Sequence, residues 1–247
     1  MTRTFLKACL NGSRSRASHP RCPITAAELA RDAVAAVEAG AEAVHVHPRD
    51  SEGRESLQRH DVATAVEAIK GSVGVPVGVT TGAWIVGDPS ARLEAVAAWS
   101  ALPDFASVNF HEAGAVELAE LLLRLGVEVE AGVWDMTAAQ VLSQSGLAPR
   151  CLRILLEPND QTVTEALVTV GEIDAVLEEA AADVPRLLHG VDATAWALLD
   201  EAARRGDAAR IGLEDTLVLP EGRMARDNAE LVRVARARLD QPEGRAG

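Results

Sequence analysis

Short apolar runs alternate along the chain with longer stretches in which alanine, leucine, glutamate and arginine recur at helical spacing. A short apolar run favours a strand, and a stretch whose apolar residues repeat every three or four positions favours a helix. The pattern predicts eight strands, over residues 5–10, 43–47, 75–80, 105–109, 127–133, 152–156, 186–189 and 209–213. It predicts a helix after each strand, over residues 26–39, 61–70, 90–99, 116–125, 137–145, within 168–182, 193–205 and 228–239.

Local signals mark both ends of the first predicted helix. Thr25 stands just before it and Glu28 follows three residues later, which is the spacing of a capping box. Gly40 follows the last helical position and favours termination there.

The regular alternation of strand and helix indicates the α/β class with a parallel sheet. Eight strand–helix units in 247 residues predict closure into a single-domain (β/α)8 TIM barrel, a fold that typically needs about 250 residues. An open doubly wound sheet is the structural alternative, but the segment LNGSRSR after the first strand does not match a glycine-rich phosphate loop. We expect the barrel to occupy residues 1–240 and residues 241–247 to form a frayed tail.

Composition and charge narrow the range of environments and partners. The chain is 48% hydrophobic and 25% charged, as in soluble globular proteins, and no apolar run reaches the roughly 20 residues of a membrane helix. The N-terminal apolar stretch is too short for a signal peptide, so a cytoplasmic location is expected. The net charge of −13, without a Lys/Arg run, argues against nucleic acid and anionic membranes as partners. Three widely spaced cysteines argue against a disulfide framework or a cysteine zinc site.

Polar side chains stand at the predicted strand ends, where a barrel enzyme has its active site. His45 and His47 end the second strand, and residues two apart on a strand share a face. Two imidazoles facing the barrel interior suit a divalent metal ion, although hydrogen-bonded structural histidines have the same pattern.

Glu214, at the end of the eighth strand, is the candidate third ligand, because alternate strands contribute to one interior layer of such a barrel. Three protein ligands and one open position are typical of catalytic zinc. Glu214 and Asp215 would otherwise be acids that cap the next helix.

Other strand ends add polar groups that would line a pocket. Thr80, Thr81 and Gly82 end the third strand and offer hydroxyls and backbone amides suited to a carboxylate, although an ordinary turn has the same composition. The remaining candidates belong to the fourth to seventh strands: Asn109, Glu130, Glu157 and His189.

Several motifs together resemble the β-keto acid cleavage enzymes, the family of the 3-keto-5-aminohexanoate cleavage enzyme. They are CPITAAELARDAVAAVEAGAEAVHVHPRDSEG, the TTG of the third strand, and RIGLEDT followed by NAELV at residues 228–232. The resemblance covers nearly the whole chain in the same order. It implies a zinc-dependent barrel enzyme that converts a β-keto acid and acetyl-CoA into acetoacetate and a new acyl-CoA.

The resemblance also assigns metal-binding and catalytic roles to matching residues. It implies that His45, His47 and Glu214 bind zinc. It implies that Asp215 is the general base and that Arg210 orients this base or the substrate.

The substrate-binding residues implied by the resemblance come from other strand ends. Thr80 or Thr81, together with Gly82, matches a Ser-Thr-Gly that holds the substrate carboxylate, and Asn109 matches a residue that lines the pocket. Where the family commonly has TGAE, with an acid that binds a substrate amine, this chain has Asn-Gly-Ser-Arg, so Arg14 replaces the acid. We therefore expect a substrate whose distal end is neutral or anionic.

Coenzyme A is large and anionic, so arginines near the barrel mouth should receive it. The candidates are Arg14, Arg16 and Arg49. The resemblance further implies a homo-oligomer, either a dimer or a tetramer.

Three competing functions belong to other classes. A Schiff-base aldolase needs a lysine inside the barrel, but Lys70 ends a helix and Lys7 lies early in the first strand, toward the wrong end. A metal-dependent hydrolase also uses HxH on a barrel strand, usually the first strand with further histidines on the fifth and sixth. A barrel that binds a metabolite without catalysis is the third alternative.

Overall fold

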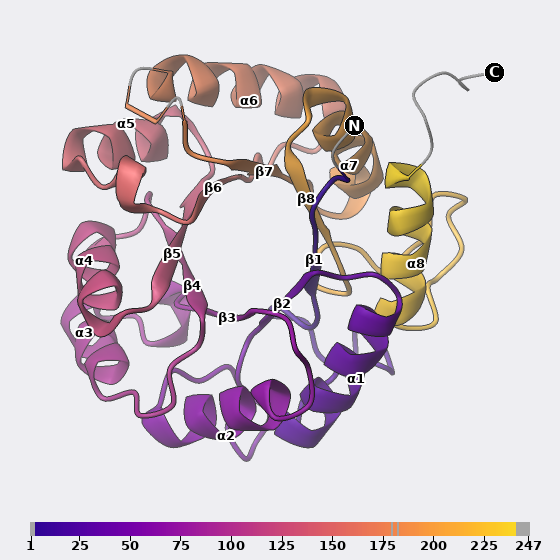
Figure 1. Ribbon diagram of the computed structural model, residues 1–247, viewed down its shortest axis with the longest axis horizontal. Helices are drawn as coiled ribbons and strands as arrows, with labels where there is room; N and C mark the ends of the chain where they lie inside the picture. Colours follow the sequence, from indigo (N-terminus) through magenta and orange to yellow (C-terminus); the bar gives the residue numbers. More distant parts are fainter. Residues whose placement is uncertain (1–2, 179, 182, 241–247) are drawn as a thin grey trace.

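Eight parallel strands close into a barrel in chain order, with β8 paired back to β1 (Figure 1). The computed structural model describes residues 3–178, 180–181 and 183–240, so the predicted tail over 241–247 lies outside the described residues. The strands are β1 Leu6–Cys9, β2 Ala43–Val46, β3 Val77–Thr80, β4 Phe105–Asn109, β5 Glu128–Val133, β6 Arg153–Leu156, β7 Arg186–Leu188 and β8 Ala208–Ile211. The predicted (β/α)8 barrel is confirmed.

Helices form the outer layer around the barrel (Figure 1). They are α1 Ala26–Glu38, α2 Arg59–Lys70, α3 Pro89–Ala97, α4 Ala115–Leu125, α5 Met136–Ser145, α6 Val163–Leu177, α7 Ala195–Arg205 and α8 Asn228–Leu239. Short 3-10 helices precede three of the longer elements: η1 Ala83–Ile85, η2 Ala148–Arg150 and η3 Asp192–Thr194. Among the described residues, no helix has the length and apolar character that crossing a membrane requires.

Side-chain caps explain where two of these helices begin. The Thr25 hydroxyl accepts a hydrogen bond from the Glu28 amide, and the Glu28 carboxylate accepts one from the Thr25 amide, so the predicted capping box is confirmed. Helix α6 begins earlier than predicted, because the Thr162 side chain caps it by accepting from the Glu165 amide at 3.3 Å.

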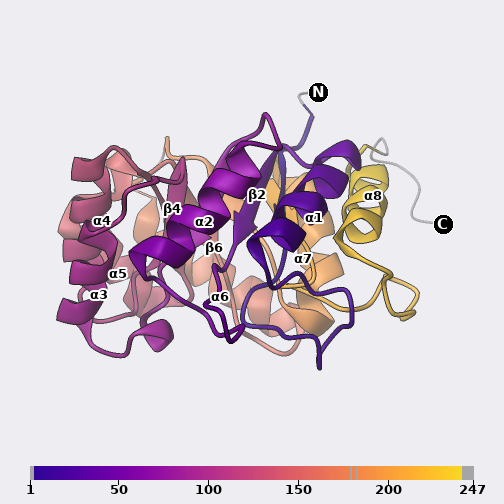
Figure 2. The same ribbon diagram turned by 90° about the horizontal axis from the view of Figure 1, so that it is seen from below.

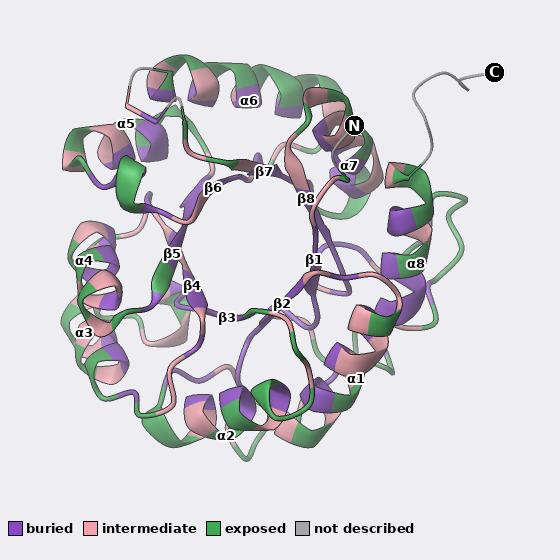
Figure 3. Cartoon of the chain, in the orientation of Figure 1, coloured by how far each residue is buried: buried purple, intermediate pink, exposed green. Residues whose placement is uncertain are grey.

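The apolar core lies between the barrel and the helices. The strands and the inner helix faces are buried, whereas the outer helix faces are exposed (Figure 3). On β2, Val44 and Val46 belong to this core and alternate with His45, as the period of a strand requires.

Side chains fill the amino-terminal part of the barrel interior, which leaves the carboxyl ends of the strands for a site. The Phe105 ring occupies the space beside Gly78, where a Cβ atom would come within 2.0 Å of it. Lys7 and Glu130 form an ion pair with both side chains fully buried. The loops that follow β1 and β2 gather at one edge of the barrel, the lower edge in Figure 2.

Candidate active site

A cavity of about 390 Å³ opens at the carboxyl ends of the strands. Each of the eight strands contributes to its wall, either with its last residues or with the loop that follows it. Residues that line it include Arg14, His45, Thr80, Asn109, Glu157 and His189.

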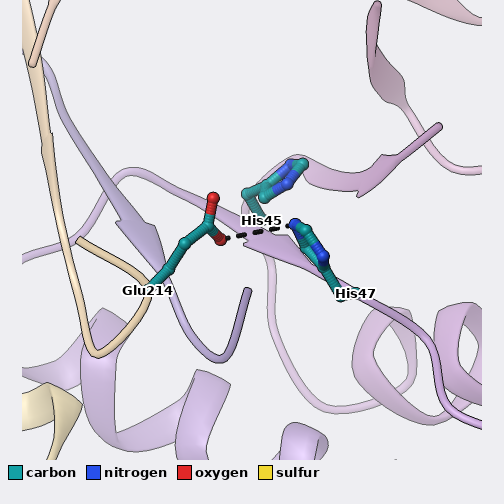
Figure 4. A group of neighbouring side chains, drawn as sticks. All are labelled: His45, His47 and Glu214. Atoms are coloured by element: carbon teal, nitrogen blue, oxygen red, sulfur yellow. Dashed lines mark ion pairs between the residues drawn. The ribbon is translucent and has the colours of Figure 1, made fainter. Parts of the chain in front are cut away.

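His45, His47 and Glu214 come together on one side of this cavity (Figure 4). One possible ligand atom from each residue lies within 4.8 Å of the other two. The His47 Nε2 atom is 3.7 Å from Glu214 Oε2, and the two imidazole rings lie 5.3 Å apart at 81°. The structure thus brings together the two histidines of β2 and the acid after β8 that the sequence singles out.

The donor atoms of this group fit a divalent cation. His45 Nδ1 and Glu214 Oε2 are buried, and neither has a hydrogen-bond partner in the described part of the chain. Burial lowers the pKa of His45 well below its usual value, and the nearby Lys7 charge adds to this effect. A neutral imidazole nitrogen and a carboxylate oxygen without a hydrogen-bond partner are the groups with which these side chains bind a metal ion.

A second layer of contacts orients His47. Its Nδ1 atom lies 2.6 Å from Glu55 Oε1, and its ring stacks against Trp84, whose indole nitrogen donates to the same carboxylate. The Asn11 side chain accepts from the His47 amide and donates to its carbonyl, both at 2.9 Å. Sequence analysis missed Glu55, which the loop after β2 returns to the site through an antiparallel bridge with Arg49.

Asp215 lies next to this group and is fully buried. Its Oδ1 atom accepts from Arg210 Nε at 3.0 Å and from Arg210 Nη2 at 2.7 Å. Its Oδ2 atom is buried and has no hydrogen-bond partner among the described residues. Burial raises the pKa of Asp215, and the Arg210 guanidinium counteracts this effect. Arg210 also donates to Glu214 Oε1 at 2.9 Å, so one guanidinium joins both acids.

Buried His189 and partly buried Glu157 form a pair on the opposite wall. The His189 Nε2 atom lies 2.8 Å from Glu157 Oε1, and His189 Nδ1 lies 3.8 Å from Asp215 Oδ1. Burial by itself would raise the pKa of Glu157, but His189 and Arg210 outweigh it and lower this pKa to about 2. The pair therefore extends the charged network of Arg210 and Asp215 along the cavity wall.

Thr80 and Thr81 have different environments. Thr80 lines the cavity, and its hydroxyl oxygen accepts from the Gly82 amide at 3.1 Å. Thr81 instead donates its hydroxyl to the Ser107 carbonyl at 2.6 Å. Gly82 packs under Trp84, where a Cβ atom would approach the ring to 2.3 Å. Asn109 lines the cavity and donates to Glu112 at 3.1 Å.

Glu130 does not stand at a strand end, contrary to the sequence-based expectation, because β5 continues to Val133. Its side chain is fully buried inside the barrel, where it contacts Lys7 and lies 3.3 Å from Arg153 Nε. The predicted strand over 127–133 ends where β5 does, so the error was to take Glu130, a residue in the middle of this strand, for one at its end. Among the described residues, neither lysine lines the cavity, and Lys70 pairs with Asp104 on the surface.

The three arginines considered for coenzyme A have different environments. Arg14 lines the cavity and pairs with Asp192 Oδ1 at 2.6 Å. Arg49 donates to the carbonyls of Gly12 and Arg14 and so supports the loop after β1. Arg16 pairs with Glu28 at the start of α1.

The chain matches proteins of one known family over nearly its whole length. A family model described as beta-keto acid cleavage enzyme matches residues 3–244. Two proteins named 3-keto-5-aminohexanoate cleavage enzyme are similar to this chain. The one from Acetoanaerobium sticklandii is 23% identical and the one from Fusobacterium nucleatum is 24% identical. Each alignment covers 94% of this chain, and they cover 90% and 89% of the respective relatives.

Solved structures with the same fold include those of ObcA. Apo ObcA superposes with a TM-score of 0.68 at 19% identity over 88% of this chain. The ternary complex of ObcA with a C4-CoA adduct and oxalate gives the same TM-score and identity over 89% of this chain. The present chain spans 61% and 64% of these two ObcA chains, and the likeness is one of fold.

Proposed function

The chain belongs to the β-keto acid cleavage enzyme family, and from this premise we propose that it exchanges acyl groups between a β-keto acid and acetyl-CoA. The products would be acetoacetate and the acyl-CoA of the remaining fragment. The observation that carries this proposal is the convergence of His45, His47 and Glu214 beside Asp215 and Arg210. ObcA, which has the same fold, forms a complex with a C4-CoA adduct, and this supports coenzyme A as the acyl carrier.

His45, His47 and Glu214 would hold a zinc ion. Their donor atoms lie within 4.8 Å of one another, and two of these residues carry buried polar atoms without partners in the described chain. Zinc bound there would supply a Lewis acid that polarises the β-keto oxygen. Glu55 supports the assignment, because metal-binding imidazoles commonly donate their other N–H to a carboxylate.

Thr80 and Asn109 would bind the carboxylate of the β-keto acid. Because the Thr80 oxygen accepts from the Gly82 amide, its own O–H can donate to a substrate oxygen. Asn109 uses one N–H on Glu112, and its amide carries a second N–H. Both side chains line the cavity that also contains the metal-binding group.

Asp215 would act as the general base. Arg210 holds its Oδ1 atom, so Oδ2 is the oxygen that accepts a proton from C2 of the β-keto acid. C2 then forms a bond to the acetyl carbonyl while the thioester C–S bond breaks, and the released thiolate attacks the original keto carbon. Cleavage of the bond between C2 and that carbon yields acyl-CoA, and Asp215 returns its proton to C2 of acetoacetate. Arg210 and His189, which contact Asp215, line the cavity, so this carboxylate lies directly behind the cavity wall.

The distal end of the substrate would carry no ammonium group. At the position where the family commonly has an acid, this chain has Arg14, and its charge is balanced by Asp192 at 2.6 Å. A neutral distal end therefore suits this wall best, and an anionic end is tolerated better than a cationic one. The predicted homo-oligomer and the cytoplasmic location remain predictions of the same proposal.

A turnover assay tests the proposed function. The zinc-loaded protein is incubated with acetyl-CoA and a panel of β-keto acids with neutral, anionic or aminated ends, and both products are measured by mass spectrometry. We expect acetoacetate and the matching acyl-CoA in equal amounts, with the aminated substrate turned over least. Breakdown of a substrate by water without acetyl-CoA would instead support a metal-dependent hydrolase.

A further inference from the structure

An ion pair lies over the backbone of Glu214 and Asp215, the third proposed metal ligand and the proposed base. Arg14, in the loop after β1, pairs through Nη2 with Asp192 Oδ1 in the segment after β7, at 2.6 Å. These two loops flank β8, after which Glu214 and Asp215 follow. The ion pair therefore joins the two strand ends on either side of these acids.

Arg14 and Asp192 each also donate a hydrogen bond to the Glu214–Asp215 backbone. Arg14 Nε donates to the carbonyl oxygen of Glu214 at 3.2 Å. The Asp192 amide donates to the carbonyl oxygen of Asp215 at 2.7 Å. Two successive carbonyls are thus fixed by two residues that are themselves bound to each other.

Asp192 has a strained backbone conformation. Its φ of +48° is the only positive φ of a non-glycine residue in the described part of the chain. Such a conformation is disfavoured for residues with a Cβ atom and persists where surrounding contacts enforce it, often at functional sites. The bonds to Arg14 and to the Asp215 carbonyl are contacts of this kind.

The same loop encloses the side chain of Glu214. Gly12 lies so close that a Cβ atom on it would come within 2.5 Å of Glu214 Cγ. Arg49 donates to the carbonyls of Gly12 and Arg14 and thereby supports this loop. Glu214 is held at its side chain by Gly12 and at its carbonyl by Arg14.

We propose that Arg14 and Asp192 are positioning residues that clamp the Glu214–Asp215 backbone and so preset the metal ligand and the base relative to each other. The inference rests on the proposed function for the roles of these two acids. It assigns to Arg14 a positioning task in addition to its place in the cavity wall. Its Nε and Nη2 atoms are directed to Glu214 and Asp192.

Variants of both residues test the clamp. R14M and D192N each remove one side of the ion pair, and Asn tolerates a positive φ, so D192N keeps the backbone conformation accessible. R16M, an exposed arginine two positions along the same loop, is the matched control. Zinc affinity is measured by competition with a chelator, and the hydrogen exchange of the Asp192 amide is measured in the apo protein.

We expect each single variant to weaken zinc binding about 10- to 100-fold, the range known for residues that orient ligands. The double variant should bind zinc no more weakly than the weaker-binding single variant, because both substitutions break the same ion pair. Protection of the Asp192 amide should fall in R14M and should stay at the wild-type level in R16M.

Unchanged zinc affinity together with unchanged exchange in R14M would overturn the clamp. Wild-type zinc affinity in both R14M and D192N would also overturn it, and a shift in substrate preference alone would then leave Arg14 with substrate contact as its role. Because the affinity and exchange measurements need no turnover, a protein that shows the expected losses but exchanges no acyl groups would contradict only the proposed function.

Discussion

The Nδ1 atom of His47 lies 2.6 Å from Oε1 of Glu55, so one nitrogen of this imidazole is held by a carboxylate while the other faces Glu214. The contact selects the tautomer with its lone pair on Nε2, which is the form that binds a metal ion. Trp84 stacks against the ring and donates to Glu55, so the orientation has two supports.

Replacing Glu55 should weaken metal binding without removing a ligand. We expect E55Q to bind zinc about 10- to 100-fold less tightly than the wild type, because the ring loses its carboxylate partner. Competition with a fluorescent chelator measures the change. E52Q, in the same loop but exposed, is the control, and wild-type affinity in E55Q would contradict the orienting role.

Removing any one of the three proposed ligands should abolish stoichiometric zinc binding. H45A, H47A and E214Q each leave only two donors, which a structural or catalytic zinc site does not tolerate. Metal content is measured by inductively coupled plasma mass spectrometry after dialysis. The exposed His60 provides the control variant H60A, and retention of full zinc in H45A would mean that the ion is bound elsewhere.

Asp215→Asn should abolish turnover but keep the metal. The amide still accepts hydrogen bonds from Arg210 but cannot take up a proton, so kcat should fall about 10²- to 10⁴-fold. Steady-state kinetics and zinc content are measured on the same sample. A loss of zinc as large as the loss of activity would indicate a structural role, and D200N on the surface of α7 is the control.

The buried pair of Lys7 and Glu130 should act on stability rather than on substrate binding. K7M leaves a carboxylate inside the barrel whose one remaining ion-pair partner among the described residues is Arg153, which should reduce the free energy of unfolding by about 3–5 kcal/mol. K7M/E130Q should recover much of this loss. Denaturant unfolding is the measurement, and K70M, which breaks a surface pair, should cost less than about 1 kcal/mol.

Kinetics of E130Q separate this structural role from the substrate-binding role that the sequence suggests. A raised KM for the β-keto acid with unchanged unfolding would favour substrate contact. Loss of stability with an unchanged KM is the result expected from the position of Glu130 inside the barrel.

Asp32 on α1 should make the protein less stable as the pH rises. Burial raises the pKa of Asp32 to about 6, and Asp227 adds to the effect while the hydrogen bond from Asn228 opposes it. Because an unfolded aspartate has a pKa of about 3.9, the folded state binds this proton more tightly, and the stabilisation is lost between about pH 4 and about pH 6.

The variant D32N isolates this contribution. Its melting temperature relative to that of the wild type should increase between about pH 4 and about pH 6, because the wild type alone must ionise a carboxylate in a half-buried site. Differential scanning fluorimetry over this range measures the trend. E38Q, on the exposed face of the same helix, is the control, and parallel pH curves for D32N and wild type would contradict the assignment.

Local patterns in the sequence were sufficient to predict the barrel and the strand ends that carry the site. Helix α8 was predicted over the residues where it is found, because its apolar positions and polar start lie within one short stretch. The alternation of side chains along β2 likewise indicated that His45 and His47 share a face. Both inferences use contacts between residues close in the chain, for which spacing is enough.

Contacts between distant residues were decided by the tertiary structure alone. Arg14 meets Asp192 across 178 positions, and Lys7 meets Glu130 across 123. Sequence analysis took Arg14 for a residue that meets the substrate or coenzyme A, and Glu130 for a residue at a strand end. Which side chains meet across a closed barrel depends on strand register and on the paths of the loops. Neither leaves a periodic signal in the chain, so the charge of a residue could be known from the sequence while its partner could not.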